Sequence, residues 1–194
     1  MAGTRGDTPK RILDAAVAEF ARHGLAGARV DRIATSANAN VRSIYAHFGN
    51  KEDLFFAALN VALDDMAASV PIIDDDLPQW AGRLFDYHLA HPEALRIHLW
   101  RQLERPEHGH HSTSSYVERV RAISPDDKVT TQSVDMLVLI FGLAQSWYLS
   151  PAVLLTADGS DPTSPQRLQD HRRALVHAAT TICERAVTQA GSAG

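Results

Sequence analysis

Residues 29–51 read RVDRIATSANANVRSIYAHFGNK, and the interpretation of the whole chain starts from this stretch. The polar run SANAN, residues 36–40, separates two short segments in which apolar residues recur at helical spacing. The first segment is predicted to form a helix over 30–37, and the second over 41–48. Two short helices joined by a tight turn are typical of the helix-turn-helix, a DNA-binding motif.

The residues of the turn support this interpretation. Val30, Ile33 and Ala34 share one face of the first helix and are expected to be buried. Asn38 can adopt the left-handed backbone conformation that a tight turn needs. Asn40 can then cap the following helix with its side chain. The motif is therefore expected to fold in the ordinary way.

The second helix of such a motif enters the major groove, where its outward side chains contact base edges. Ile44 and Phe48 share its inward face, so Val41, Arg42 and Ser43 remain outside. Arg42 is expected to bind guanine and Val41 a thymine methyl group, because these pairings match the groups that the bases present. Ser43 is the third candidate for base contact. Phosphate contacts are expected from Tyr45, His47 and Lys51, and more weakly from Arg29, Thr35 and Asn40.

Charge is distributed unevenly along the chain. The formal net charge is −4, which by itself argues against nucleic acid as a partner. Residues 1–51, however, hold eight Lys and Arg against four acidic residues, whereas residues 52–194 hold eleven against nineteen. The two net charges are therefore +4 and −8, as expected for a basic binding face on an acidic body.

Composition places the chain among globular proteins. Of its 194 residues 45% are hydrophobic and 22% charged, so a packed core is available. Cys183 is the only cysteine and forms no internal disulfide. The N-terminus lacks a signal-peptide pattern, and the longest apolar run, residues 136–144, is too short to span a bilayer. We therefore expect a cytoplasmic protein that has no membrane partner.

Residues 10–59 resemble the DNA-binding region of the tetracycline-repressor (TetR) family of transcriptional regulators. This region covers about a quarter of the chain, and its matching residues fall on the expected face of each helix. They are Ile12, Leu13, Ala15, Ala16, Phe20, Gly24, Val30, Ile33, Ala34, Ile44, Tyr45, His47, Phe48, Lys51 and Glu52.

The chain departs from the family pattern at four places. The family usually has Ser or Thr near the start of the first motif helix, where Ala28 and Arg29 stand here. Asn38 replaces the Gly of the turn and Asn40 the Ser before the second helix. Arg42 replaces a common Gly in the second helix and adds a bidentate donor suited to guanine. These differences affect the operator sequence that we expect rather than DNA binding itself.

The remainder of the chain shows only helical patterns, so the fold is predicted to be all-α. We expect a helix-turn-helix domain over 1–51, with an N-terminal arm over 1–8, and a larger helical domain over 52–194. Gly24 is expected to end the first helix. The longest amphipathic helices are predicted over 126–149 and 166–189, with a long exposed connection over 151–165. Other helices are expected to end near Ser69, to span 79–90 and 115–123, and to begin at Pro92.

The resemblance implies that the last two long helices pair with those of a second copy, and that the middle helices bind a small effector. Large aromatic and soft side chains with polar groups are suited to line such a pocket, although they also fill ordinary cores. We expect a mostly apolar molecule to release a homodimeric repressor from its DNA operator. The candidate ligand-binding residues are Trp80, Leu84, Phe85, Tyr87, His88, Trp100, Leu103, Met136, Ile140, Phe141, Trp147 and Tyr148.

Other functions are less favoured. No phosphate loop, nucleophile elbow or zinc-helix motif is present, so no enzyme and no cofactor are expected. His108, His110 and His111 have the character of metal ligands but are better explained as a flexible loop, and no metal site is predicted. The main alternative is an architectural DNA-binding protein that responds to no ligand.

Overall fold

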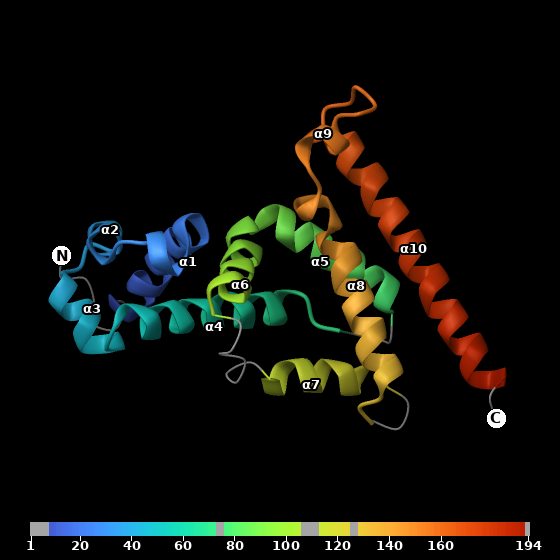
Figure 1. The fold of residues 1–194 in the computed structure, drawn as a ribbon, viewed down its shortest axis with the longest axis horizontal. Helices are drawn as coiled ribbons and strands as arrows, with labels where there is room; N and C mark the ends of the chain where they lie inside the picture. The colour runs from blue at the N-terminus through green and yellow to red at the C-terminus, as the bar shows by residue number, and fades with distance from the viewer. Residues whose placement is uncertain (1–7, 73–75, 106–112, 125–127, 193–194) are drawn as a thin grey trace. The chain divides into compact units, whose positions relative to one another are not determined.

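The computed structural model describes residues 8–72, 76–105, 113–124 and 128–192, and every regular element in these ranges is a helix (Figure 1). The predicted all-α fold is therefore confirmed. The expected arm before Thr8, the histidines of residues 108–111 and part of the acidic run at 74–76 lie outside the described residues. The helices are α1 (Thr8–Gly27), α2 (Val30–Ser36), α3 (Val41–Phe48), α4 (Lys51–Ser69), α5 (Leu77–Ala90), α6 (Pro92–Glu104), α7 (Thr113–Ala122), α8 (Thr131–Leu149), α9 (Ala152–Leu155) and α10 (Pro165–Ser192).

The helices divide between two compact units. The first unit contains α1–α4 and α6, and the second contains α5 and α7–α10. Helix α6 thus belongs with the N-terminal helices, although it follows α5 directly in the chain. The functional boundary expected after residue 51 stays a prediction and falls inside the first unit, because α1 packs against α4 and α6 to form the core.

The core of the first unit forms where α1 packs against α4 and α6. Ile12, Ala16 and Phe20 of α1 are fully buried, at the spacing that places them on one helical face. Phe20 meets Phe55 of α4 edge to face, with ring centroids 5.1 Å apart. Ile97 of α6 is also fully buried. The short helices α2 and α3 come between α1 and α4 in the chain, as the colours of Figure 1 show.

Gly24 was predicted to end the first helix, but it breaks α1 with φ 67° and ψ −178°, and the helix continues to Gly27. Residues in this left-handed region of φ are strained unless they are glycine. There is also no room for a larger residue, because a Cβ at position 24 would lie 2.8 Å from the Trp100 ring and 2.9 Å from Glu104 Oε1. The chain therefore turns toward α2 at a point where α6 touches its backbone.

The second unit packs α5 and α8 with the long helix α10. Trp80 of α5 is fully buried, donates its indole N–H to the carbonyl of Val70 at 2.9 Å, and meets Phe141 of α8 edge to face. At Gly82 a Cβ would come within 2.9 Å of Val176 Cγ2, so α5 and α10 approach closely. Arg172 of α10 binds Asp86 of α5 with 2.8 Å between Nε and Oδ2.

Two predicted boundaries in this unit were wrong. Helix α8 begins at Thr131 rather than near residue 126, because Thr130 and Ser133 form a reciprocal capping box. The connection expected over 151–165 contains the short helix α9, whose Leu154 N–H binds the carbonyl of Pro151. Among the described residues, no helix is both long and apolar enough to cross a membrane.

Candidate nucleic-acid interface

In the turn between α2 and α3, Asn38 and Asn40 have the predicted conformation and capping role. Asn38 has φ 48° and is the one non-glycine residue with positive φ in the part of the chain that the structure describes. Asn40 caps α3, since its side-chain oxygen accepts the Ser43 N–H at 2.7 Å. Thr35 donates its hydroxyl proton to the carbonyl of Asp31 at 2.9 Å, within its own helix.

Helix α3 is held by its inward face and exposes its outer face. Ile44 is buried to 1% exposure, whereas Val41 is 37% and Tyr45 43% exposed. Arg42 and His47 are exposed as well. Within the described residues, Arg42 has no hydrogen bond or ion pair, so its guanidinium is available for an external acceptor. This arrangement fits a helix that inserts into a groove.

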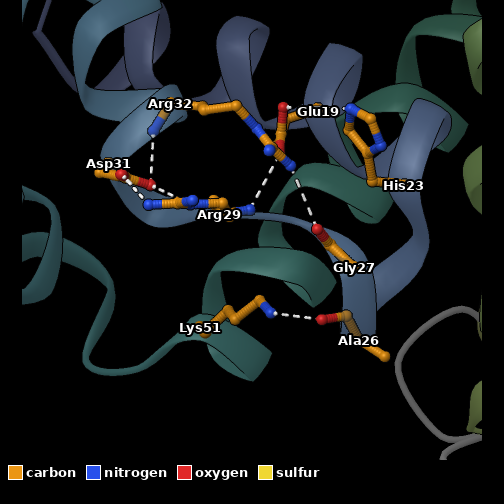
Figure 2. A network of polar contacts seen from close by, with 8 residues as sticks. All are labelled: Glu19, His23, Ala26, Gly27, Arg29, Asp31, Arg32 and Lys51. Carbon is orange, nitrogen blue, oxygen red and sulfur yellow. Dashed lines mark hydrogen bonds and ion pairs between the residues drawn. The ribbon is translucent and has the colours of Figure 1, made fainter.

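The start of α2 is a charged network, shown in Figure 2. Arg29 forms an ion pair with Asp31, with 2.7 Å between Nη2 and Oδ2. Arg32 forms one with Glu19 of α1, with 2.6 Å between Nη2 and Oε1, and also donates to the carbonyl of Gly27. Burial raises the pKa of Glu19, but hydrogen bonds from the Arg32 side chain and the Arg29 N–H lower it overall. Both arginines are thus neutralised by carboxylates in the free protein.

The start of α4 is tied back to α1. Lys51 donates to the carbonyl of Ala26 at 3.2 Å, as Figure 2 shows, so its ammonium is engaged within the protein. Asn50 caps α4 by accepting the Asp53 N–H, and its amide donates to the Asp53 carboxylate. Lys51 must exchange an intramolecular partner if it is to contact a phosphate.

Helix α6 holds the break in α1 from the other side. Trp100 donates its indole N–H to the carbonyl of Ala21 at 3.2 Å. The Glu104 carboxylate accepts the N–H of Leu25 at 2.5 Å and that of Ala26 at 3.3 Å. These are the backbone groups that the break leaves without helical partners. Trp100 was expected to line the effector pocket, whereas the structure places it beside the DNA-binding helices.

The second unit contains a cluster of aromatic rings that we call the aromatic cluster. Its members are Phe85, His88, Trp147, Tyr148 and His171. Ring centroids are 4.5 Å apart between Trp147 and His171, 5.3 Å between Phe85 and His171, and 6.0 Å between His88 and Tyr148. Burial, with the charge of nearby Arg167, lowers the pKa of His171. Burial and the charge of Asp86 raise the pKa of Tyr148.

The candidate effector residues are therefore only partly brought together. Trp80, Leu84, Phe85, His88, Ile140 and Trp147 are buried, and Tyr87, Met136, Phe141 and Tyr148 are half-buried, all in the second unit. Trp100 and Leu103 lie on α6 in the first unit, and Leu103 is 75% exposed. Among the described residues, no group of three His, Cys, Asp or Glu side chains is arranged to hold a metal ion.

Sequence reasoning missed Glu19, Glu104 and His171. Glu19 and Glu104 act on backbone groups 10 and 79 residues away in the chain, and no local pattern marks such contacts. His171 lies on α10, within the helix predicted over 166–189, but it was not among the candidate ligand-binding residues. Its contacts with Phe85 and Trp147 depend on how three helices pack.

The fold and the exposed helix α3 define a helix-turn-helix DNA-binding protein. Comparison with known proteins identifies the family within this class. Residues 12–58 match the family described as "Bacterial regulatory proteins, tetR family", and residues 76–181 match "Tetracyclin repressor-like, C-terminal domain". The chain belongs to the TetR family of transcriptional regulators.

Several relatives support this assignment. The chain is 40% identical over 172 residues to the HTH-type transcriptional repressor SCO4008 of Streptomyces coelicolor, covering 84% of this chain and 90% of the relative. It is 27% identical over 128 residues to the HTH-type nicotine-responsive transcriptional repressor HdnoR of Paenarthrobacter nicotinovorans, covering 61% and 66%. Among solved structures, the putative transcriptional regulator SCO4942 of Streptomyces coelicolor has a TM-score of 0.76 and 31% identity, covering 90% of this chain and 97% of that one.

Proposed function

We propose that the protein is a homodimeric repressor whose α3 helices read the two halves of a DNA operator, and which a small, mostly apolar molecule releases. The observation that carries DNA reading is the exposed, unpaired guanidinium of Arg42 beside the exposed Val41 at the start of α3. Arg42 is assigned to guanine, Val41 to a thymine methyl group, and Ser43 to a further base contact.

The phosphate contacts are ranked by what each side chain already does. Tyr45 and His47 are exposed on α3 and are the first candidates. Lys51 and Arg29 must exchange the Ala26 carbonyl and the Asp31 carboxylate for phosphate oxygens. Asn40 uses its oxygen in the cap, so only its amide N–H group remains as a donor. Thr35 already donates its one hydroxyl proton and is the weakest candidate.

Operator selection with wild type and Arg42→Ala tests this assignment. The variant is expected to lose about 1–3 kcal/mol of operator binding and to accept any base pair at one position in each half-site. Arg121→Ala, which removes an exposed arginine of α7, is the control and should select the wild-type operator. If Arg42→Ala weakens binding to all DNA sequences equally, Arg42 contacts phosphate rather than base.

The homodimer is assigned to α8 and α10, the long helices of the second unit. Val134, Val138 and Leu139 of α8 are 38%, 62% and 51% exposed, an apolar face that a monomer would leave in water. Gly142 continues this face and has no neighbouring atom within 4 Å of a Cβ position, so another helix can approach closely there. Two copies place two reading helices on a two-fold operator.

Sedimentation of Val138→Glu tests the dimer. A glutamate buried in the interface would lose its hydration, so the variant is expected to sediment as a monomer and to bind operator weakly. Ala68→Glu, at an exposed position of α4 outside α8 and α10, serves as a control for added negative charge. A Val138→Glu protein that remains dimeric would show that this face of α8 lies outside the interface.

The effector is assigned to the aromatic cluster, with Trp80 and Phe141 beside it. Phe85 and Trp147 give the cluster apolar surface, and the Tyr148 hydroxyl is buried without a hydrogen-bond partner among the described residues. Such a site favours an aromatic molecule with one polar atom that the hydroxyl can bind. The relative HdnoR is named as nicotine-responsive. Nicotine and related weakly basic aromatic compounds are therefore the first probes for this chain.

Quenching of tryptophan fluorescence and release from operator together test the effector assignment. Trp147 lies in the cluster, so a bound ligand should quench its emission, and Tyr148→Phe should weaken the ligand that uses the hydroxyl. Trp100→Phe, which leaves the cluster intact, should keep the response. Operator binding that no compound in a broad panel alters would favour the alternative function, an architectural DNA-binding protein without an effector.

A further inference from the structure

Helix α2 begins without a cap of its own. Its N-cap residue is Arg29, whose side chain makes no capping hydrogen bond. A capping box would need Ser or Thr at this position and Glu or Gln three residues later, where this chain has Arg32. The first N–H groups of a helix lack helical partners and need acceptors from elsewhere. Within α2 the Asp31 carboxylate accepts the Arg32 N–H at 3.0 Å, whereas the Arg29 N–H takes its acceptor from outside the helix.

Glu19 of α1 supplies the missing acceptor. One of its carboxylate oxygens, Oε1, accepts the Arg29 backbone N–H at 2.8 Å and the Arg32 Nε–H at 2.8 Å (Figure 2). The Glu19 side chain is only 11% exposed, so its position is set by packing. Arg32 also donates to the Gly27 carbonyl, which closes the connection from α1 to α2.

The contact matters for DNA reading because α2 carries α3. A tight turn of four residues, 37–40, joins the two helices, and α3 has a single buried anchor in Ile44. A small rotation at the start of α2 would therefore move the side chains of α3 relative to the bases. Sites of recognition lose specificity when their supporting contacts are loose.

We propose that Glu19 is a positioning residue for DNA recognition, which accepts the Arg29 N–H in place of the Glu or Gln that a capping box has at the position of Arg32, and which fixes α2 and α3 against α1. Glu19 itself contacts no DNA in this role. The inference rests on DNA reading by α3, the function proposed above. It concerns how this chain orients that helix rather than which bases it reads.

A positioning role and a purely electrostatic role of Glu19 predict opposite changes in operator affinity when the residue is removed. Removing a negative charge near DNA raises affinity for every sequence, because a repulsion is lost. Removing a positioning contact lowers affinity for the operator alone, because non-specific binding needs no exact placement of α3. The ratio of operator affinity to non-specific affinity separates the two.

The experiment compares full-length wild type and Glu19→Ala on a selected operator duplex and on a scrambled duplex of the same length, each at two salt concentrations. Operator affinity is expected to fall roughly 2- to 30-fold, the range that the loss of a helix cap implies. Affinity for the scrambled duplex should stay level or rise. Glu19→Gln keeps an acceptor oxygen and should show a smaller loss; this variant decides the question if Glu19→Ala does not fold.

Two further variants sharpen the result. Asp14→Asn removes an exposed carboxylate of the same helix, which pairs with Lys10 and contacts no part of α2, so it should leave the ratio unchanged. Arg32→Gln supplies an acceptor for the Arg29 N–H within α2, and in the double variant the loss from Glu19→Ala should shrink. Additive losses in this double-mutant cycle would contradict the cap role.

An unchanged operator affinity in Glu19→Ala, or a parallel rise on both duplexes, would overturn the inference while leaving the proposed function intact. A wild-type protein that did not prefer its selected operator to the scrambled duplex would overturn the proposed function, and the role of Glu19 in reading with it. The two failures are therefore distinguishable in one set of titrations.

Discussion

The carboxylate of Glu104, at the end of α6, accepts the backbone N–H of Leu25 at 2.5 Å, although 79 residues separate the two in the chain. Leu25 follows the break at Gly24, so this N–H has no partner in α1. Trp100 binds the Ala21 carbonyl just before the break. One turn of α6 thus supplies hydrogen-bond partners for backbone groups of α1 on both sides of Gly24. Only His91 separates α5 from α6, so the chain passes from a helix of the second unit into the helix that holds the break in α1.

Glu104→Ala is expected to destabilise the first unit by about 1–3 kcal/mol, because it leaves the N–H groups of Leu25 and Ala26 without an ionised acceptor. Chemical unfolding followed by circular dichroism measures this. Leu103→Ala, an exposed neighbour on the same turn, should be nearly neutral. Equal effects of the two substitutions would mean that the carboxylate contributes little.

Gly24→Ala is expected to cost about 1–3 kcal/mol for the left-handed backbone, with a further loss from displacing the Trp100 ring. Gly159→Ala is the matched control, since Gly159 also has a positive φ but nothing within 4 Å of a Cβ. The difference between the melting temperatures of the two variants then measures the cost of displacing the Trp100 ring of α6. If the two variants melt alike, backbone strain alone explains the need for glycine at position 24.

Lys51→Ala should weaken binding to all DNA sequences and reduce the slope of log affinity against log salt by about 0.9 for each lost contact. The physical reason is that a neutralised phosphate releases its condensed counterion. Titrations at several salt concentrations measure the slope. Lys128→Ala, an exposed lysine of the second unit, should leave the slope as in wild type. A changed sequence preference in Lys51→Ala would instead indicate a base contact.

His98 predicts a pH dependence of stability. Burial, and to a lesser degree the charge of Arg101, lowers the pKa of His98 to about 4, against about 6.5 when unfolded. Between these values the unfolded chain binds a proton that the folded chain does not, so stability falls as the pH falls from 6.5 to 4. His98→Gln should show a shallower loss over this window in denaturant titrations. Parallel curves for the two proteins would show that other groups cause the acid sensitivity.

Local sequence predicted most of the DNA-binding helices correctly. The turn Asn38, the cap Asn40 and the break at Gly24 each depend on the conformational preference of a single residue, and such preferences can be read along the chain. The start of α8 was placed too early, since the periodic apolar pattern does not reveal that Thr130 and Ser133 would pair as a capping box.

The sequence by itself determined the helical fold, the reading helix and its exposed Arg42, because helix periodicity and turn chemistry act over a few residues. Tertiary structure alone decided that Glu19 caps α2, that Glu104 holds the break in α1, and that Trp100 lies beside α1 rather than in the aromatic cluster. These contacts join groups 10 to 79 residues apart. Their partners are chosen by the packing of whole helices, which no short stretch of sequence encodes.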